Sequence, residues 1–204
     1  MKKEDLWGGL PTMETVSQEQ GTVSASKTGL LVGNRIPRDF FEVAGCGESD
    51  ITIHAGSFHL ALQDAGIERY NIMTYSSILP GIARKVDPPA QMVHGAVLES
   101  ILSVSHAEAG QTATAGIIYA WLYDRLSGKR YGGLVCEHNG NYPVEELKTK
   151  LYASLNELYE NGFSDHYVLD QPTLLWKSFS PTKKFGTALV GLCFSSYVYP
   201  ILQP

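Results

Sequence analysis

The 204-residue sequence has only three cysteines, Cys46, Cys136 and Cys193, and they lie far apart along the chain. An odd number of widely spaced cysteines excludes a disulfide framework and a C-x-x-C metal clip. We therefore expect a reduced, cytoplasmic protein. The first residues, MKKEDLW, have two lysines but no apolar run behind them, which excludes a secretory signal.

Charged residues are also scarce, and neither sign dominates. Lys and Arg number 16 and Asp and Glu 21, so the net charge is −5 and the charged fraction is 18%. Because no Lys/Arg run is present, we expect no nucleic-acid partner. Residues 186–199 form the longest apolar candidate, but Ser195-Ser196 interrupts it and Pro200 follows. A membrane span needs about 18 residues, so we expect no membrane partner.

Residues 1–28 are rich in Gly, Ser, Thr, Glu and Gln and predict a mobile leader, followed by a single domain over residues 29–204. The patterning of that domain predicts strands and helices in the order strands, helix, strands, helix, strands. The helices are expected over 58–65, capped by Gly66, and over 143–161, stopped by Gly162; the strands or apolar segments are 38–43 (ended by a turn over 45–50), 70–75, 92–106, 112–123, 131–137 and two in the last 40 residues. Without regular βαβ alternation, this order favours an α+β layered sandwich.

Several familiar motifs are incomplete. His106-Ala107-Glu108 matches half of a zinc-deaminase signature, but the P-C-x-x-C half is missing. His54 and His59 are five apart, a poor ligand spacing on one helix, and no H-E-x-x-H, G-x-S-x-G or P-loop is present. We expect no metal site.

One group of residues in the sequence has side chains suited to catalysis. Ser76-Ser77 comes at the end of a predicted strand, and Ile78-Leu79-Pro80-Gly81 follows it. Asn71 precedes Ser77 by six residues, and Glu137 ends a later strand. A Ser-Ser pair alone is usually a turn, so its meaning depends on the wider pattern.

That wider pattern resembles the pyruvoyl-dependent arginine decarboxylase family. Residues 58–67, Asn71 and residues 76–80 look like the family's cleavage-site region. The resemblance covers about residues 30–200, and further stretches fall in the family's order and spacing: 33–37 through 47–50, 94–99, 110–117 and 133–137.

The resemblance implies a four-layer αββα sandwich of the pyruvoyl-dependent histidine/arginine decarboxylase type. It also implies self-cleavage between Ser76 and Ser77 into residues 1–76 (the beta chain) and 77–204 (the alpha chain). Ser77 would become a pyruvoyl group, the only cofactor, with neither metal nor PLP. Protomers would form trimers or multiples of trimers, with active sites between neighbours.

The resemblance also implies the roles of individual residues. Ser77 would be the nucleophile, and Asn71 would place an amide near the scissile carbonyl, where a developing oxyanion needs a donor. Glu137 would be the general acid of decarboxylation, and an apolar strand end is a suitable setting for a carboxyl group that gives up a proton near neutral pH. His59, Asn71 and Ile78 would contact the substrate.

At one position the sequence departs from the family. An aspartate that pairs with the substrate guanidinium is expected after Phe58, but this chain has His59 there. An imidazole cannot offer the bidentate contact of a carboxylate. Either another carboxylate substitutes, or the substrate is a different amino acid, or decarboxylase activity has been lost. The candidate carboxylates are Asp64, Glu48, Asp50 and Glu99, and His94 and His106 are further candidates to line a site.

The function implied is a self-processing decarboxylase that converts L-arginine to agmatine and carbon dioxide, in polyamine synthesis or acid resistance. One alternative is a pyruvoyl-dependent decarboxylase of another amino acid. A second is an unprocessed, non-catalytic homologue that binds a ligand or partner. A serine hydrolase that uses Ser77 is weakened because the sequence offers no recognisable His/Asp partners.

Overall fold

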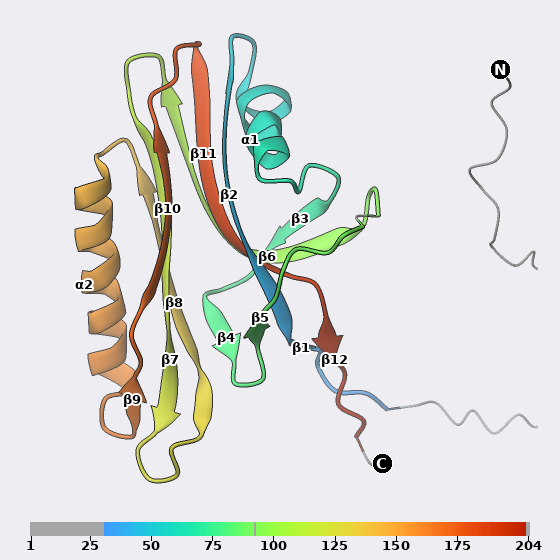
Figure 1. Cartoon of the computed structure of the whole chain (residues 1–204), viewed down its shortest axis with the longest axis vertical. Coiled ribbons are helices and arrows are strands. Elements are labelled where there is room, and N and C mark those ends of the chain that lie inside the picture. The colour runs from blue at the N-terminus through green and yellow to red at the C-terminus, as the bar shows by residue number, and fades with distance from the viewer. Residues whose placement is uncertain (1–30, 92, 203–204) are drawn as a thin grey trace, which may run out of the picture.

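The computed structural model describes residues 31–91 and 93–202, and the predicted leader over 1–28 lies outside the described residues. Two five-stranded sheets make up most of the fold (Figure 1). One has the order β3 (Asn71–Thr74), β6 (Val97–Glu108), β11 (Phe185–Phe194), β2 (Asp39–Ser49), β5 (Arg84–Lys85). The other has the order β10 (Thr173–Phe179), β7 (Ala113–Asp124), β8 (Arg130–Gly140), β4 (Ile78–Pro80), and β9 (Tyr167–Leu169) also pairs with β7.

The two sheets pack against each other through side chains that alternate along their strands. On β11, residues 188, 190, 192 and 194 belong to the cluster between the sheets, whereas 189 and 193 belong to a second cluster on the other face. On β7, residues 113, 115, 117 and 119 face the same inner cluster, and 118, 120 and 122 face away. This period of two is the alternation of a strand with both faces buried.

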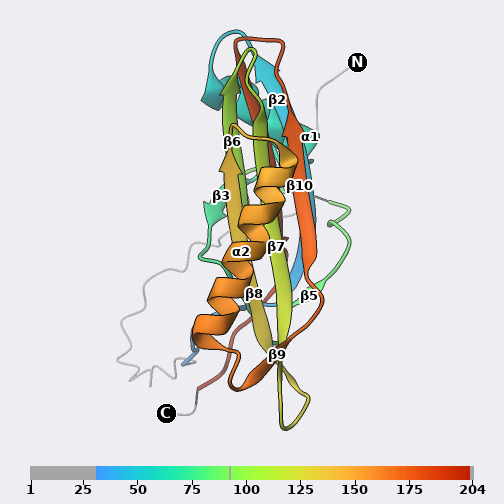
Figure 2. The same ribbon diagram turned by 90° about the vertical axis from the view of Figure 1, so that its left-hand side faces the viewer.

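Helices cover the outer faces of both sheets (Figures 1 and 2). A π-helical segment, η1 (Ile53–Phe58), leads into α1 (His59–Asp64), whose Ala61 and Leu62 pack on β2 and β11. The longer α2 (Val144–Gly162) runs obliquely across β7 and β8 in Figure 2 and packs on them through Leu147, Leu151 and Leu155. The fold is therefore of the mixed α+β class, as predicted, and consistent with a sandwich.

The predicted turn over residues 45–50 is wrong, because β2 continues through it to Ser49. Its glycines serve close packing. A Cβ added at Gly45 would lie 2.2 Å from the Ala61 carbonyl oxygen, and one at Gly47 would lie 2.5 Å from the Ser57 carbonyl oxygen. The helical segment rests directly on the backbone of β2, which requires residues without side chains.

Other predicted boundaries also shift. Strand β8 does not end at Glu137 but continues to Gly140, β6 begins only at Val97, and Gly162 is the last residue of α2 rather than its stop. The cap expected at Gly66 is confirmed, because that glycine follows the C-cap residue Ala65 of α1 and has a φ of +72°. In the described part of the chain, no helix has the length and hydropathy that a membrane crossing requires.

Candidate active site

The Ser76–Ser77 peptide lies where the chain passes from one sheet to the other. Strand β3 belongs to one sheet, β4 belongs to the other, and Tyr75, Ser76 and Ser77 connect them. We call residues 75–78 the cleavage segment. Because the two sides of Ser76–Ser77 are held by different sheets, breaking this peptide would remove no ladder hydrogen bond from either sheet.

The Ser77 side chain points at Glu137. Its Oγ lies 2.6 Å from both carboxylate oxygens, to which the hydroxyl donates. Strand β4 pairs with β8, so the strand that carries Glu137 is also the one that holds the residues after Ser77. Glu137 lies opposite Ile117 and therefore shares the inner face of the sheet, whereas the adjacent His138 faces outward and bonds to Ser154 of α2.

Backbone hydrogen bonds also fix the cleavage segment. The Val135 N–H donates to the Ser77 carbonyl oxygen (3.3 Å), and the Ile78 N–H donates to the Ser76 carbonyl oxygen (3.0 Å). Ser76 is exposed and Ser77 is half-buried. The carbonyl of the Ser76–Ser77 peptide thus lies at the surface with a hydrogen-bond donor already on its oxygen.

Upstream, Tyr75 anchors the cleavage segment. Its N–H donates to the Ser100 carbonyl oxygen (2.8 Å), and its hydroxyl donates to Glu99 (2.5 Å). Glu99 is only 4% exposed and also forms an ion pair with Arg35. A carboxylate buried to this degree needs such partners. The Tyr75 ring packs on Phe194, with the two ring centroids 5.6 Å apart.

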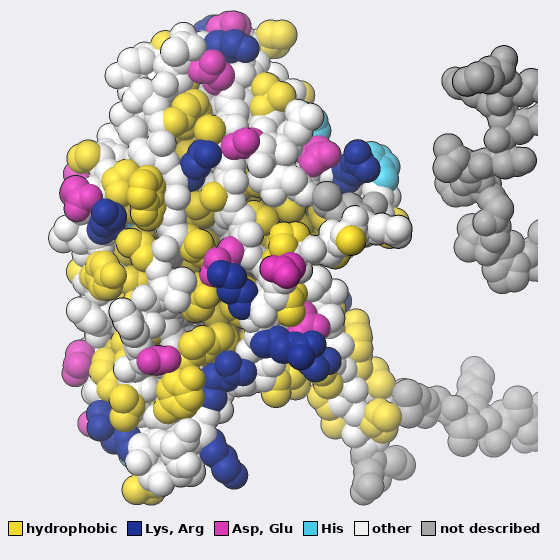
Figure 3. Space-filling model, viewed as in Figure 1, with side chains coloured by type: hydrophobic (Ala, Val, Ile, Leu, Met, Phe, Trp, Pro, Cys, Tyr) yellow, Lys and Arg dark blue, Asp and Glu magenta, His cyan; other side chains and the backbone are white. Residues whose placement is uncertain are grey.

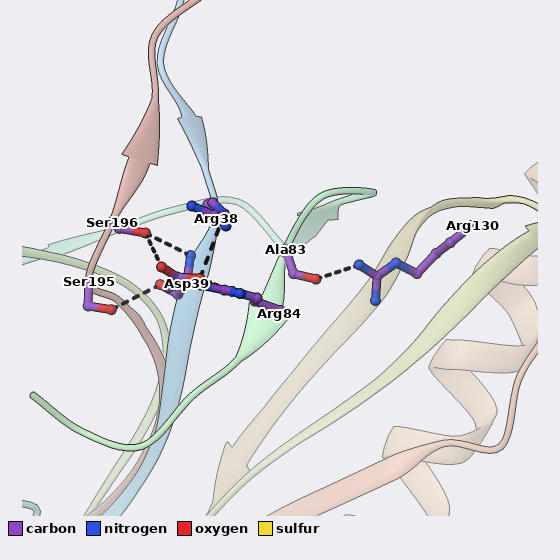
Figure 4. Close-up of polar contacts among 7 residues, drawn as sticks. All are labelled: Arg38, Asp39, Ala83, Arg84, Arg130, Ser195 and Ser196. Carbon is purple, nitrogen blue, oxygen red and sulfur yellow. Dashed lines mark hydrogen bonds and ion pairs between the residues drawn. The ribbon is translucent and has the colours of Figure 1, made fainter.

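Downstream, Arg130 anchors the turn that follows β4. Its guanidinium donates to the carbonyl oxygens of Gly81 (2.9 Å) and Ala83 (2.8 Å), and the second of these bonds is drawn in Figure 4. The same guanidinium lies over the Trp121 ring, 4.3 Å from its centroid. These contacts place the turn against β7 and β8.

Asp39 continues this anchoring to β5 (Figure 4). Arg84 Nε donates to Asp39 Oδ1 (2.5 Å), and the Ser196 hydroxyl donates to Asp39 Oδ2 (2.6 Å). The hydrogen bond from Arg84, followed by that from Ser196, holds the pKa of Asp39 below its usual value. An ionised Asp39 therefore ties β5 and the segment before β12 (Tyr197–Val198) to the start of β2.

Asn71 and His59 do not reach Ser77 within the chain. Asn71 is the first residue of β3, and its Nδ2 donates to the Gly95 carbonyl oxygen (2.8 Å). His59 is exposed at the start of α1, which covers the outer face of the sheet that does not contain Glu137. Its N–H donates to the Gly56 carbonyl oxygen, and its side chain has no hydrogen bond or ion pair with any described residue. Their roles stay predictions.

Ile78 lies beside an apolar pocket. Its side chain is 67% exposed and contributes to a pocket of about 360 Å³. The other lining residues come from β4, β7, β8 and the end of α2: Leu79, Pro80, Leu122, Tyr131, Gly132, Gly133, Leu134 and Phe163. An apolar group next to Ser77 can be accommodated there.

The four candidate carboxylates each have partners within the chain. Glu48 accepts hydrogen bonds from Thr182 and Lys183, and Asp50 accepts one from the Lys184 N–H. Asp64 accepts the Cys46 N–H and pairs with Lys177, and Glu99 already binds the guanidinium of Arg35. A substrate guanidinium would have to compete with these contacts.

Two histidines and one cysteine are further side chains with possible chemistry: His94, His106 and Cys136. His94 is exposed, whereas His106 Nδ1 lies 2.8 Å from Thr187 Oγ1, which in turn lies 2.9 Å from the buried Ser57 Oγ. Burial, together with the charge of Glu137, raises the pKa of the Cys136 thiol to about 11, so this thiol is protonated at neutral pH. No three His, Cys, Asp or Glu side chains in the described ranges are grouped so that they could hold a metal ion.

Sequence reasoning missed the anchors. The sequence pattern indicates Tyr75 only as a strand residue and Glu99 only as a candidate carboxylate, and it gives no role to Arg130. A tyrosine that ends a strand directly before Ser76 was an available signal. The contact between Tyr75 and Glu99 depends on the pairing of β3 with β6, which the sequence pattern does not specify.

Comparisons with known proteins show the family that the chain resembles. The family model described as pyruvoyl-dependent arginine decarboxylase matches residues 39–199. The pyruvoyl-dependent arginine decarboxylase AaxB of Chlamydia abortus is 34% identical over 184 residues, which covers 81% of this chain and 94% of that protein. The AaxB protein of Chlamydia muridarum is 28% identical over the same shares. Pyruvoyl-dependent arginine decarboxylase 2 of Archaeoglobus fulgidus is 31% identical over 112 residues, 52% of this chain and 67% of that protein.

Proposed function

Because the chain belongs to the pyruvoyl-dependent arginine decarboxylase family, we propose that it is a self-processing carboxy-lyase that converts L-arginine to agmatine and carbon dioxide. The observation that carries this proposal is the 2.6 Å contact between Ser77 Oγ and the Glu137 carboxylate. It joins the residue predicted to be the nucleophile to the residue predicted to be the general acid.

Processing begins when Ser77 Oγ attacks the carbonyl carbon of Ser76. An O–C bond forms, the C–N bond between the two residues breaks, and the hydroxyl proton passes through Glu137 to the departing nitrogen. Elimination then removes the α-proton of residue 77 and releases Oγ as part of the Ser76 carboxylate. One water replaces the nitrogen at residue 77, and one ammonia leaves. The residues present fit this series of reaction steps, because Ser77 Oγ already has a base, Glu137, within hydrogen-bond distance.

The ketone formed at residue 77 supplies an electron sink for decarboxylation, the role that PLP has in other enzymes. In this second reaction the chain's own residues bind the substrate and move a proton. Glu137 remains beside residue 77 because β8 holds both, and it donates the proton that replaces the departing carboxylate. Ile78 and the apolar pocket beside it exclude water on one side.

We further propose that protomers associate as trimers or multiples of trimers, within a four-layer αββα sandwich fold of the family's type. Two observations support association. Asn71 and His59 lie away from Ser77 in their own chain, so a neighbouring protomer would bring them to it. The strands β1 (Ile36–Pro37) and β12 form an arm that projects beside the main sheets, and apolar side chains cover its region in Figure 3. The segments that flank these two strands, residues 31–35 and 199–202, add exposed apolar residues: Leu31, Val32, Tyr199, Ile201 and Leu202.

The first experiment is intact-mass spectrometry of the purified chain under denaturing conditions, beside Ser77→Ala and Ser76→Ala variants. We expect the wild type to give fragments 1–76 and 77–204, the second lighter than a serine-initiated chain by one ammonia. Ser77→Ala should stay whole, whereas Ser76→Ala should cleave because it keeps the nucleophile. A wild-type chain that stays whole would contradict the proposal and favour a non-catalytic binding homologue.

The second experiment measures carbon dioxide release from each amino acid in turn. We expect arginine to be the preferred substrate. Decarboxylation of another amino acid, one with a side chain that an imidazole contacts, is the second candidate function. It is favoured by His59 and by the partners that Glu48, Asp50, Asp64 and Glu99 already have.

A further inference from the structure

The hydrogen bond from the Ile78 N–H to the Ser76 carbonyl oxygen closes a three-residue turn centred on Ser77. A bond between residues i and i+2 defines a γ-turn. Its donor and acceptor are 3.0 Å apart, within the usual range for a backbone hydrogen bond. Such a turn at Ser77 places the serine at the corner between the two sheets.

The acceptor of this bond is the oxygen of the scissile carbonyl. When Ser77 Oγ attacks the carbonyl carbon, negative charge develops on that oxygen, and a donor already aimed at it stabilises the transition state. We propose that the backbone N–H of Ile78 is the oxyanion donor of self-cleavage. This inference rests on the proposed function and adds a catalytic group to its first step.

The position of β4 explains why this N–H is available. Strand β4 is the last strand of its sheet and pairs with β8 on one side. The hydrogen bond from the Val135 N–H to the Ser77 carbonyl oxygen joins β8 to the start of β4. The Ile78 N–H does not take part in that pairing and donates to the Ser76 carbonyl oxygen. The Ile78 side chain is 67% exposed, so its packing contributes little to this geometry.

Within one chain, Ile78 is better placed for this role than Asn71. The Asn71 amide donates to the Gly95 carbonyl oxygen at the other end of β3, which is about 10 Å long by the rise of an extended strand. An Asn71 of a neighbouring protomer would supply a second donor, and the Ile78 N–H would remain the first.

The test compares self-cleavage of Ile78→Pro with that of Ile78→Ala. Proline has no N–H and is tolerated at the first residue of an edge strand. Removing one oxyanion donor slows a reaction by about 10²–10³-fold, and we expect this loss in Ile78→Pro. Ile78→Ala loses the same side chain but keeps the N–H, so it should cleave about 10²–10³-fold faster than Ile78→Pro. Circular dichroism should give the same spectrum for both variants.

Hydroxylamine, which cleaves esters, locates the step that fails. If the Ile78 N–H assists attack, Ile78→Pro forms the ester about 10²–10³-fold more slowly, and hydroxylamine releases fragments at that lower rate. Fragments released by hydroxylamine from Ile78→Pro at the wild-type rate would overturn the inference, because the attack would then proceed without the donor.

Nuclear magnetic resonance provides a test that does not depend on the folding of Ile78→Pro. In the Ser77→Ala chain labelled with ¹⁵N-isoleucine, we expect the Ile78 amide proton to exchange slowly with water. Its signal is assigned by its loss in Ser77→Ala/Ile78→Val. Exchange as fast as that of an unbonded surface amide would overturn the inference. A wild-type chain that never cleaves overturns the proposed function as well, whereas cleavage of both wild type and a folded Ile78→Pro at equal rates overturns this inference alone.

Discussion

The hydroxyl of Ser77 and the carboxylate of Glu137 lie 2.6 Å apart although 60 positions separate them in the sequence. The pairing of β4 with β8 is the reason, since Ile78 lies opposite Leu134 and the two chain segments run side by side from there. The strand that presents Glu137 therefore also fixes the residue on which it acts. Any movement of β4 relative to β8 would change both the attack geometry and the later proton transfer.

Replacing Glu137 by glutamine should separate the two reactions. The amide oxygen of the introduced glutamine still accepts the hydrogen bond from Ser77, so we expect Glu137→Gln to cleave more slowly but to completion. Decarboxylation needs a proton donor at this position, and its loss lowers kcat by about 10²–10⁴-fold. Fragment formation is measured by intact mass and kcat by carbon dioxide release.

The matched control is Glu157→Gln, which removes an exposed carboxylate on α2. It should leave both rates unchanged. Wild-type kcat in Glu137→Gln would exclude Glu137 as the general acid.

Tyr75→Phe tests the upstream anchor. Removing the hydroxyl breaks its bond to Glu99 and leaves a carboxylate that is 4% exposed with Arg35 alone. Leaving a buried charged acceptor with one partner fewer costs about 1–3 kcal/mol, and the cleavage segment should become less well ordered. We expect self-cleavage to be at least about tenfold slower than in the wild type. Gel electrophoresis of samples taken over time measures the rate.

Tyr152→Phe on α2 is the control, because its side chain is exposed on the outer face. If Tyr75→Phe and Tyr152→Phe cleave at the same rate, the contact between Tyr75 and Glu99 does not position the Ser76–Ser77 peptide.

Much of the fold could be predicted from the sequence because local patterns carried it. The helix over 143–161 and the glycine cap after α1 depend on neighbouring residues, and both are present in the structure, the helix as α2. The family resemblance assigns roles to Ser77 and Glu137, but the contact between them is known only from the structure. The anchors at Tyr75 and Arg130 could not be predicted, because they depend on which strands pair across long intervals of sequence. The glycines of β2 wrongly predict a turn for a similar reason, because their role depends on a helix that packs on them.

Replacing His59 by aspartate tests substrate recognition. A carboxylate at this position can bind a guanidinium through two hydrogen bonds, and charged bonds of this kind contribute about 1.5–3 kcal/mol. If arginine is the substrate, His59→Asp should lower KM for arginine by about tenfold or more, while kcat stays within the same range. His54→Asp, on the neighbouring η1, is the control. A higher KM in His59→Asp would show that the imidazole itself contributes to binding.

His106 should make the folded chain less stable as the medium becomes acidic. Burial, with the charge of His54 adding to it, lowers the pKa of His106. In the unfolded chain a histidine titrates near pH 6.5. As the pH falls through about 6.5, the unfolded chain gains a proton that folded His106 does not, so stability present above this pH is lost below it.

This loss is measured as the change in Tm between about pH 8 and about pH 5.5, in the Ser77→Ala chain so that the backbone is continuous. His106→Asn should reduce the change, and His166→Asn, which replaces an exposed histidine, should leave it as it is. An equal change of Tm in His106→Asn and its parent would contradict the prediction.

The close approach of α1 to β2 predicts opposite effects of two glycine-to-alanine changes. A methyl group at Gly45 would lie 2.2 Å from the Ala61 carbonyl oxygen, so the helix must move, and overpacking of this kind costs about 1–3 kcal/mol. At Gly162 nothing lies within 4 Å, and alanine there should stabilise α2 by about 0.5–1 kcal/mol. Chemical denaturation of the Ser77→Ala chain measures both free energies of unfolding. If Gly45→Ala proved as stable as its parent, β2 and α1 would not be in direct backbone contact.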